Sequence, residues 1–184
     1  MEEYPKIIYE KNGFKFNKLK NNAFNLTFDV ENQKLILSSL INFDLVKLIY
    51  DLNSDIYVSS HLQKNPDNNT AVITLLMKHF FIDLGLPQRY SHIYMTQENS
   101  DTQIVFNACS IHTDNNPNGI PSDAVLMPIK YMVITCNIIT SHKVDFNCSI
   151  VFEDDLKIPP FAEKVIGLMI HKIFTRVKQF INNY

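Results

Sequence analysis

Between Lys143 and Phe152, apolar and polar side chains alternate along the chain. A period of two predicts a strand with one apolar face and one mostly polar face. The segment before it, Tyr131 to Ile139, is rich in aromatic and β-branched residues, and only Thr140 to His142 stand between the two. A connection this short predicts that the two strands form an antiparallel hairpin.

Weaker patterns of the same kind predict further strands. Ser91 to Gln97 and Thr102 to Ile111 are separated by a short polar turn, which predicts a second hairpin. Thr70 to Phe81 begins with residues that favour a strand. Nearer the N-terminus, Phe24 to Val30 and Lys34 to Leu40 are predicted to pair with each other.

Two segments have helical patterns. From Asn42 to Leu52, apolar residues recur at the 3.6-residue spacing of a helix, and Asn42 suits the N-cap position. A second helix is predicted from Pro159–Phe161 to about Ile181, because proline is well tolerated in the first helical turn. Its first half is apolar almost all round, so this helix should be buried on more than one side. Lying across the concave face of a bent sheet would bury it in that way.

The order of these elements defines a fold class. An antiparallel sheet with one apolar face needs a cover, and the last helix is the cover available. We therefore predict an α+β protein in which a curved antiparallel sheet wraps around a long C-terminal helix. With 184 residues and no linker-like segment, we expect one domain over residues 1–184. Periodicity alone does not tell whether the space between sheet and helix is filled or hollow.

Composition narrows the class of function. Hydrophobic residues make up 46% of the chain and charged residues 20%, and the net charge is −2, so no basic excess is available for nucleic acid. The start MEEYPK lacks the apolar run of a signal peptide, and no apolar stretch reaches the ~20 residues of a membrane helix. We therefore expect a cytoplasmic protein whose three cysteines are reduced. Its high content of Asn, Ile and Lys is typical of an AT-rich genome, such as that of a protist or a large DNA virus.

The common motifs of enzymes and metal sites are missing from the sequence. The six histidines show neither H-E-x-x-H nor paired-cysteine spacing, and there is no G-x-S-x-G, P-loop or G-x-G-x-x-G motif. Cys109, Cys136 and Cys148 fall on predicted strands, and we interpret them as small core residues rather than nucleophiles. We therefore predict no catalytic residue, no metal site and no cofactor.

From Leu86 onward, a set of local sequences stands in a characteristic order. LPQRYSHIYM places Arg89 at the opening of a strand, NACSI ends the next strand, and Thr113 to Asp123 form a polar loop. VLMPIKYMVI and KVDFNCSIVFE are the two late strands, and KIPPF marks the start of the last helix. This ordered set resembles the START domains, the steroidogenic-acute-regulatory-related lipid-transfer modules of the helix-grip superfamily. The chain departs from them in having Tyr90 after the arginine and no tryptophan, which concerns the polar anchor of a ligand more than the fold.

The resemblance implies an internal cavity for a lipid, such as a sterol or a phospholipid, gated by the C-terminal helix and the 113–123 loop, for lipid transfer or sensing. Burial of hydrocarbon is favourable by about 0.8 kcal/mol per CH₂, so such binding needs no catalytic group. The alternative is that the same side chains pack a filled core. The residues expected to contact the ligand are Met77, Arg89, Phe106, Met132, Ile134, Phe146, Cys148, Phe161, Val165, Leu168, Met169 and Lys172.

A few of these candidates, and two loop residues, have a second interpretation. Arg89 and Lys172 either hold a phosphate or hydroxyl group of the ligand or lie at the surface as ordinary cations. Ile120, Pro121 and Phe161 either contact a membrane surface during loading or are ordinary exposed residues. As partners we expect a lipid ligand and a transient membrane surface, no nucleic acid, and no second copy of the chain, so that the protein is a monomer.

Two other functions stay open on the sequence. An enzyme of the same superfamily, such as a cyclase or hydrolase for a hydrophobic substrate, would need polar groups that converge in the cavity, and Arg89, His92 and Tyr94 are the candidates. An interaction module would use the fold as a scaffold with a filled core, since a fold does not fix a function.

Overall fold

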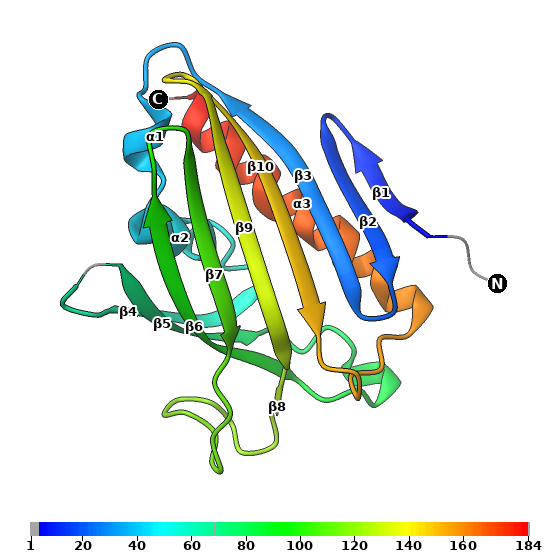
Figure 1. Cartoon of the computed structure of the whole chain (residues 1–184). Coiled ribbons are helices and arrows are strands. Elements are labelled where there is room, and N and C mark those ends of the chain that lie inside the picture. Colours follow the sequence, from blue (N-terminus) through cyan, green and yellow to red (C-terminus); the bar gives the residue numbers. More distant parts are fainter. Residues whose placement is uncertain (1–3, 68, 184) are drawn as a thin grey trace.

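The computed structural model describes residues 4–67 and 69–183 and confirms a curved antiparallel sheet wrapped around a long C-terminal helix (Figure 1). The helices are α1 (Leu37–Leu40), α2 (Phe43–Asp51), the 3₁₀-helix η1 (Ile82–Leu84) and α3 (Pro160–Asn182). The strands of the 10-stranded sheet are β1 (Lys6–Lys11), β2 (Phe14–Lys20), β3 (Ala23–Glu31), β4 (Tyr57–Lys64), β5 (Thr70–Met77), β6 (Arg89–Asn99), β7 (Gln103–Ser110), β8 (Val125–Leu126), β9 (Ile129–Thr140) and β10 (Lys143–Phe152).

The sheet places the two predicted hairpins near its centre. Its strand order is β1-β2-β3-β10-β9-β7-β6-β5-β4, with β8 paired in parallel to β6. The β9–β10 and β6–β7 hairpins are confirmed, both antiparallel. In β9–β10, Phe146 lies opposite Cys136 and Cys148 lies opposite Ile134. Residues directly opposite in a pair of strands share one face, so these four side chains all point to the concave side.

The strand predicted from Lys34 to Leu40 is wrong. These residues form a turn and the short helix α1, and β3 pairs with β2 and β10 instead. The Asn32 side chain holds the turn, because its Oδ1 accepts hydrogen bonds from the backbone N–H groups of Lys34 and Leu35. Leu37 is buried at the end of the core. The apolar run here serves packing and not strand pairing.

Strands at the edges of the sheet carry weak sequence signals. β1 and β4 are mostly exposed, so their apolar residues do not alternate clearly with polar ones, and the sequence-based interpretation contains neither strand nor β2. The segment from Thr70 to Phe81 begins as a strand, as predicted; β5 ends at Met77, and the chain then forms the connection that contains η1. The edges and connections were therefore harder to predict than the centre.

Both predicted helices are present. Asn42 caps α2 as expected, since its Oδ1 accepts hydrogen bonds from the N–H groups of Asp44 (2.8 Å) and Leu45 (3.2 Å). α3 begins at Pro160 and lies along the sheet behind β3 and β10 (Figure 1). At Gly167 a Cβ atom would lie 3.2 Å from Cβ of Tyr9, so glycine lets β1 approach the helix closely. No helix in the described part of the chain is both long and apolar enough to cross a membrane.

Candidate ligand-binding cavity

A cavity of about 270 Å³ lies between the concave face of the sheet, α2 and α3. Its wall is almost entirely apolar, and none of the described residues that line it carries a charge. The lining residues are Phe16, Leu26, Phe28, Ile41, Asn42, Leu45, Val46, Ile49, Tyr50, Tyr57, Met95, Phe106, Met132, Ile134, Cys136, Phe146, Cys148, Ile150, Ile170, Ile173 and Phe174.

The central strands supply the floor of the cavity. Alternate residues of β9 and β10 point to the concave face, and among them are the predicted ligand contacts Met132, Ile134, Phe146 and Cys148. All four retain some accessible surface although they lie beneath α3. Since all four line the cavity, part of that surface belongs to the cavity wall. The predicted contact Phe106, on β7, also lines the cavity.

Helix α3 covers the cavity with a face that the sequence does not single out. Ile170, Ile173 and Phe174 line the cavity, one helical turn apart from each other or adjacent. The predicted contacts on this helix do not line the cavity. Leu168 is 53% exposed, and Lys172 forms an ion pair with Asp55. Val165 and Met169 are also absent from the cavity wall, as is Phe161 at the start of the helix.

The remaining predicted contacts also lie away from the cavity. Met77 ends β5, and Arg89 opens β6 and donates a hydrogen bond to the carbonyl oxygen of Leu126 at 3.3 Å. Phe161 is 47% exposed at the start of α3, where its ring meets that of Phe81 edge to face with centroids 5.9 Å apart. Contact of these residues with a ligand therefore stays a prediction that the cavity itself does not support.

Helix α2 and the start of β4 contribute a wall that the sequence-based contact list lacks. Leu45, Val46 and Ile49 belong to the apolar stripe that predicts α2, so the periodic pattern was the signal for their position. Tyr50 and Tyr57 join them, with ring centroids 5.3 Å apart and ring planes at 84°. Nothing in the local sequence distinguishes these two tyrosines from ordinary core residues.

The thiols at the cavity wall are not activated as nucleophiles. Burial raises the pKa of Cys136 and the pKa of Cys148 to about 12, so both stay protonated at neutral pH. A thiolate is the nucleophilic form of cysteine, and neither residue has it available. Both residues act as small apolar side chains, which leaves space beneath α3.

The polar residues considered for catalysis do not converge. His92 Nδ1 and Thr74 Oγ1 are hydrogen-bonded at 2.9 Å, and Tyr94 is 38% exposed. Met95, the next residue of β6, lines the cavity, so Tyr94 points to the opposite face of the sheet. Arg89, His92 and Tyr94 are all absent from the cavity wall. Among the described residues, no group of three or more His, Cys, Asp or Glu side chains is placed to hold a metal ion.

Polar contacts tie the second half of α3 to the turn between α2 and β4. Arg176 forms an ion pair with Asp55, in which Nη2 lies 3.1 Å from Oδ2, and its Nη1 donates to Asn53 Oδ1 at 2.9 Å. These hydrogen bonds, first from Arg176 and then from Lys172, hold the pKa of Asp55 well below its usual range. At the end of the helix, the Asn32 side chain donates to the carbonyl oxygen of Ile181 at 2.5 Å.

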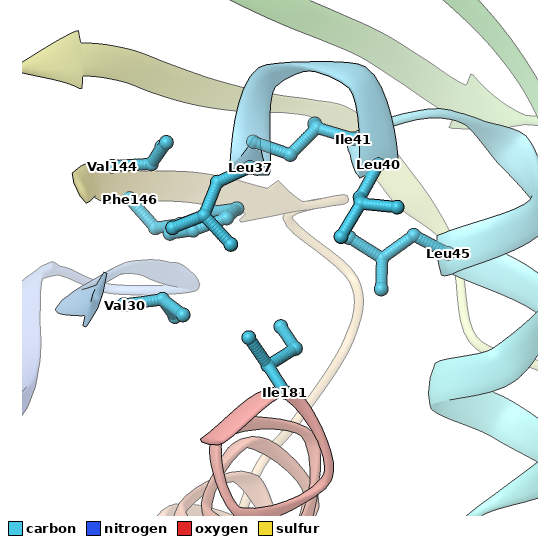
Figure 2. A pocket seen from close by; sticks show the side chains of 8 residues that line it. All are labelled: Val30, Leu37, Leu40, Ile41, Leu45, Val144, Phe146 and Ile181. Carbon is cyan, nitrogen blue, oxygen red and sulfur yellow. The ribbon is translucent and has the colours of Figure 1, made fainter. Parts of the chain in front are cut away.

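Apolar side chains also pack together at this same end, beside a second pocket of about 310 Å³ whose wall includes Leu45, Phe180 and Ile181. Figure 2 shows the side chains of eight apolar residues converging between α1, β3, β10 and the end of α3. Ile181 of α3 points toward Leu37 of α1 and Val30 of β3. The space left between them is about 10 Å³, which is at the lower limit for a single water molecule. The C-terminal end of α3 is therefore fixed by both packing and hydrogen bonds.

The first half of α3 has a different attachment. Lys18 of β2 and Glu163 form an ion pair of 2.7 Å, with both side chains largely buried. Around this half lie exposed apolar residues, Phe161 and Leu168 on α3 and Phe80, Ile82 and Leu84 on the β5–β6 connection. This end of the helix therefore presents apolar surface to the outside.

The 113–123 loop packs on the end of β5 and β6. The Tyr90 hydroxyl donates a hydrogen bond to Asn116 Oδ1 at 2.9 Å, and the Asn116 amide donates to the carbonyl oxygens of Pro121 (2.6 Å) and Ala124 (3.0 Å). Ile120 is half-buried against Tyr90, whereas Pro121 is exposed. The loop therefore has a defined internal structure.

Comparisons with known proteins show which structures this architecture resembles. No protein-family model matches the chain, and no curated protein matches its sequence. Solved structures do match. Human STARD10 has a TM-score of 0.72 at 8% identity, over 96% of this chain and 72% of that one. The chain has a START-like fold.

Two further human structures agree with this START-like fold. The lipid transfer and protein localization domain of StarD13 has a TM-score of 0.68 at 10% identity, over 96% of this chain and 88% of that one. StAR-related lipid transfer protein 5 has a TM-score of 0.63 at 12% identity, over 97% and 85%. The resemblance read from the sequence is thus confirmed at the level of fold.

Proposed function

We propose that this START-like protein binds one apolar ligand, a lipid, in the internal cavity, and that it transfers or senses that lipid. The observation that carries the proposal is the cavity of about 270 Å³, which has apolar walls, lacks lining charges and lies beneath α3. Removing hydrocarbon from water into such a space is favourable by about 0.8 kcal/mol per CH₂. The names of two of the similar structures, which refer to lipid transfer, support the same function.

The volume and the lining of the cavity help to decide between a lipid-binding protein, an interaction module and an enzyme. An empty space of this size argues against a filled scaffold that serves only for protein interaction. The lack of convergent polar groups argues against an enzyme. A sterol or a phospholipid, the ligands first expected, has more atoms than the space accommodates, so either one would require α3 to move away from the sheet.

We assign the gate to the first half of α3 together with the 113–123 loop. The second half of α3 is tied by Arg176, Asn32 and the closely packed end around Ile181. Outward movement of the first half would break the Lys18–Glu163 ion pair and open the cavity from that side while the contacts of the second half persist. While the ligand is exchanged, a membrane surface would contact Phe161, Ile120 and Pro121. The protein would act in the cytoplasm and as a monomer.

The test is to fill the cavity and to measure ligand uptake. Cys148→Phe places a large ring in the empty space, whereas Cys109→Phe makes the same change at an exposed position of β7. The proteins are incubated with phosphatidylcholine vesicles that contain cholesterol or a fatty alcohol, and native mass spectrometry then detects bound lipid. We expect uptake by the wild type and by Cys109→Phe, and none by Cys148→Phe.

Thermal unfolding serves as the control for folding in the same experiment. Cys148→Phe should unfold at the same temperature as the wild type or higher, because it fills a void rather than crowding a packed site. If the wild type takes up no lipid from either type of vesicle, or if Cys148→Phe takes up as much as the wild type, the proposed function is wrong.

A further inference from the structure

Two tyrosines bring hydroxyl groups to the cavity wall. Tyr50 lies in the last turn of α2 and Tyr57 opens β4, so one short turn joins them. Their rings meet edge to face, with centroids 5.3 Å apart. No serine or threonine is among the described residues that line the cavity. The tyrosine pair is therefore the source of hydroxyl groups at this wall.

Neither hydroxyl is paired with a residue that the structure describes. No described residue forms a hydrogen bond with the Tyr50 or the Tyr57 hydroxyl. A tyrosine hydroxyl in the interior usually finds a hydrogen-bond partner. Neither hydroxyl is fully enclosed, since among the described residues the fully buried side-chain atoms without a partner are Asn17 Oδ1 and Gln97 Oε1. The environment is an interior one, since burial raises the pKa of Tyr50 to about 12 and raises the pKa of Tyr57 further above its usual range.

Part of the surface of these two side chains belongs to the cavity wall. Tyr50 and Tyr57 are both partly accessible, although they are surrounded by protein. Both belong to the cavity wall. A molecule inside the cavity is therefore in a position to supply the missing hydrogen-bond partner.

The lack of charged residues in the described cavity wall limits the chemical class of that hydrogen-bond partner. The described residues of the cavity wall include no cation to neutralise a phosphate or a carboxylate and no anion to neutralise an amine. Asp55, on the turn between the two tyrosines, is already paired with Arg176 and Lys172 and is partly exposed to solvent. An ionised group that entered the cavity would lose its hydration without gaining a counter-ion, which is strongly unfavourable.

The volume of the cavity limits the number of atoms in the ligand. At about 30 Å³ for each water-sized volume, a cavity of about 270 Å³ holds on the order of nine non-hydrogen atoms. That number suits a medium-length chain or a small ring system with one polar end. It does not suit a lipid with two acyl chains.

We infer that Tyr50 and Tyr57 form the polar anchor of the cavity and select a small neutral lipid with one hydroxyl or carbonyl oxygen. The inference rests on the proposed function, and it adds the chemical class of the ligand. The tyrosines act through hydrogen bonds to that oxygen, while the apolar wall binds the hydrocarbon. A hydrocarbon lacks the oxygen, and an ionised lipid lacks a counter-ion.

The test uses octane, 1-octanol and octanoate, which share one chain and differ at its end. Each compound displaces a fluorescent apolar probe from the purified full chain at pH 7.5. One net hydrogen bond is worth about fivefold in affinity, so we expect 1-octanol to bind about fivefold or more tighter than octane. Octanoate should bind more weakly than 1-octanol.

Tyrosine-to-phenylalanine variants test the assignment to these two residues. Tyr50→Phe, Tyr57→Phe and the double variant should lose the preference for 1-octanol and keep the affinity for octane. The exposed Tyr94→Phe is the matched control and should behave as the wild type. Thermal unfolding of the ligand-free variants should be unchanged or shifted upward, whereas loss of a structural hydrogen bond would lower it.

The possible results separate the two proposals. Equal binding of octane and 1-octanol by the wild type, or a preference that survives in the double variant, overturns the polar anchor and leaves the lipid cavity intact. Failure of all three compounds to bind, together with failure of vesicle lipids to bind, overturns both the anchor and the proposed function.

Discussion

Two substitutions on α3 test which face of this helix covers the cavity. Ile173 is 7% exposed and belongs to the cavity wall, whereas Leu168 is 53% exposed on another face. Both residues lie in the interior of the same helix, and both are branched apolar residues. Ile173→Ala and Leu168→Ala therefore remove three carbon atoms each from positions that differ mainly in burial.

The expected magnitudes follow from that difference. Three buried carbon atoms at about 0.8 kcal/mol each give roughly 2.4 kcal/mol for Ile173→Ala. We expect about 2 kcal/mol, at the lower end of the 2–5 kcal/mol usual for such a change, because one side of Ile173 already faces empty space. Leu168→Ala should change the free energy of unfolding by no more than about 0.5 kcal/mol, since it is mostly exposed.

Urea unfolding followed by circular dichroism measures both values. The midpoint should fall clearly for Ile173→Ala and hardly at all for Leu168→Ala, with the dependence on urea concentration unchanged. Equal losses in the two variants, or a larger loss for Leu168→Ala, would contradict the orientation of α3 and with it the cavity wall described above.

Two further measurements probe the surroundings of the cavity. Because hydrogen bonds from its cationic partners hold the pKa of Asp55 below its usual range, its contribution to stability is present above about pH 4 and is lost as the pH falls through the folded-state pKa. Asp55→Asn should therefore reduce the acid-induced loss of stability below about pH 4 and cost no more than about 1 kcal/mol at pH 7, as measured by thermal unfolding across pH. Ellman's reagent at pH 8 should modify the exposed Cys109 rapidly and the buried Cys136 and Cys148 slowly, because burial raises the pKa of both to about 12. Rapid labelling of Cys148, detected by peptide mass mapping, would mean that the cavity opens widely to water.

The centre of the sheet was predictable from the sequence because each of its strands has one face toward the interior. The alternation from Lys143 to Phe152 fixed which side chains share a face, and the short connection to the preceding strand fixed the partner. At Lys34 to Leu40 the same kind of apolar run was misleading. There the Asn32 side chain turns the chain by local hydrogen bonds that an apolar pattern does not contain.

The helix face was not predictable for a related reason. Along α3, Val165, Leu168 and Met169 form an apolar stripe, and Ile166, Ile170 and Ile173 form another beside it. Both stripes have the spacing of a helix, so periodicity gives no preference between them. The choice is made by β1, which packs closely at Gly167, and by the Arg176–Asp55 ion pair, which fixes the rotation of the helix. Both contacts join segments that are distant in the sequence.

The cavity has a cost in stability, because the side chains around it lack packing partners on one side. In engineered cores, a closed cavity costs about 24 cal/mol per Å³ in lost packing, so unfilled space between a sheet and a helix is unfavourable. Phe28 offsets part of this loss of packing. Its ring centroid lies 4.7 Å from that of Phe146 and 4.7 Å from that of Phe174, so it joins the sheet to α3.

A wall supported in this way keeps its shape without a ligand, and it leaves the missing contacts to be made by whatever enters. The contacts that a well-packed core would already have made become binding energy for an apolar molecule. In a filled core, small side chains such as Cys136 and Cys148 at the middle of the sheet would face large ones on the helix. Here Cys148 keeps accessible surface in the cavity that Ile170 and Phe174 also line, and the hydroxyls of Tyr50 and Tyr57, which bond to no described residue, belong to the same wall. Apolar contacts and hydrogen bonds are both left incomplete at one place, which is what a preformed site for a mainly apolar molecule with one polar atom requires.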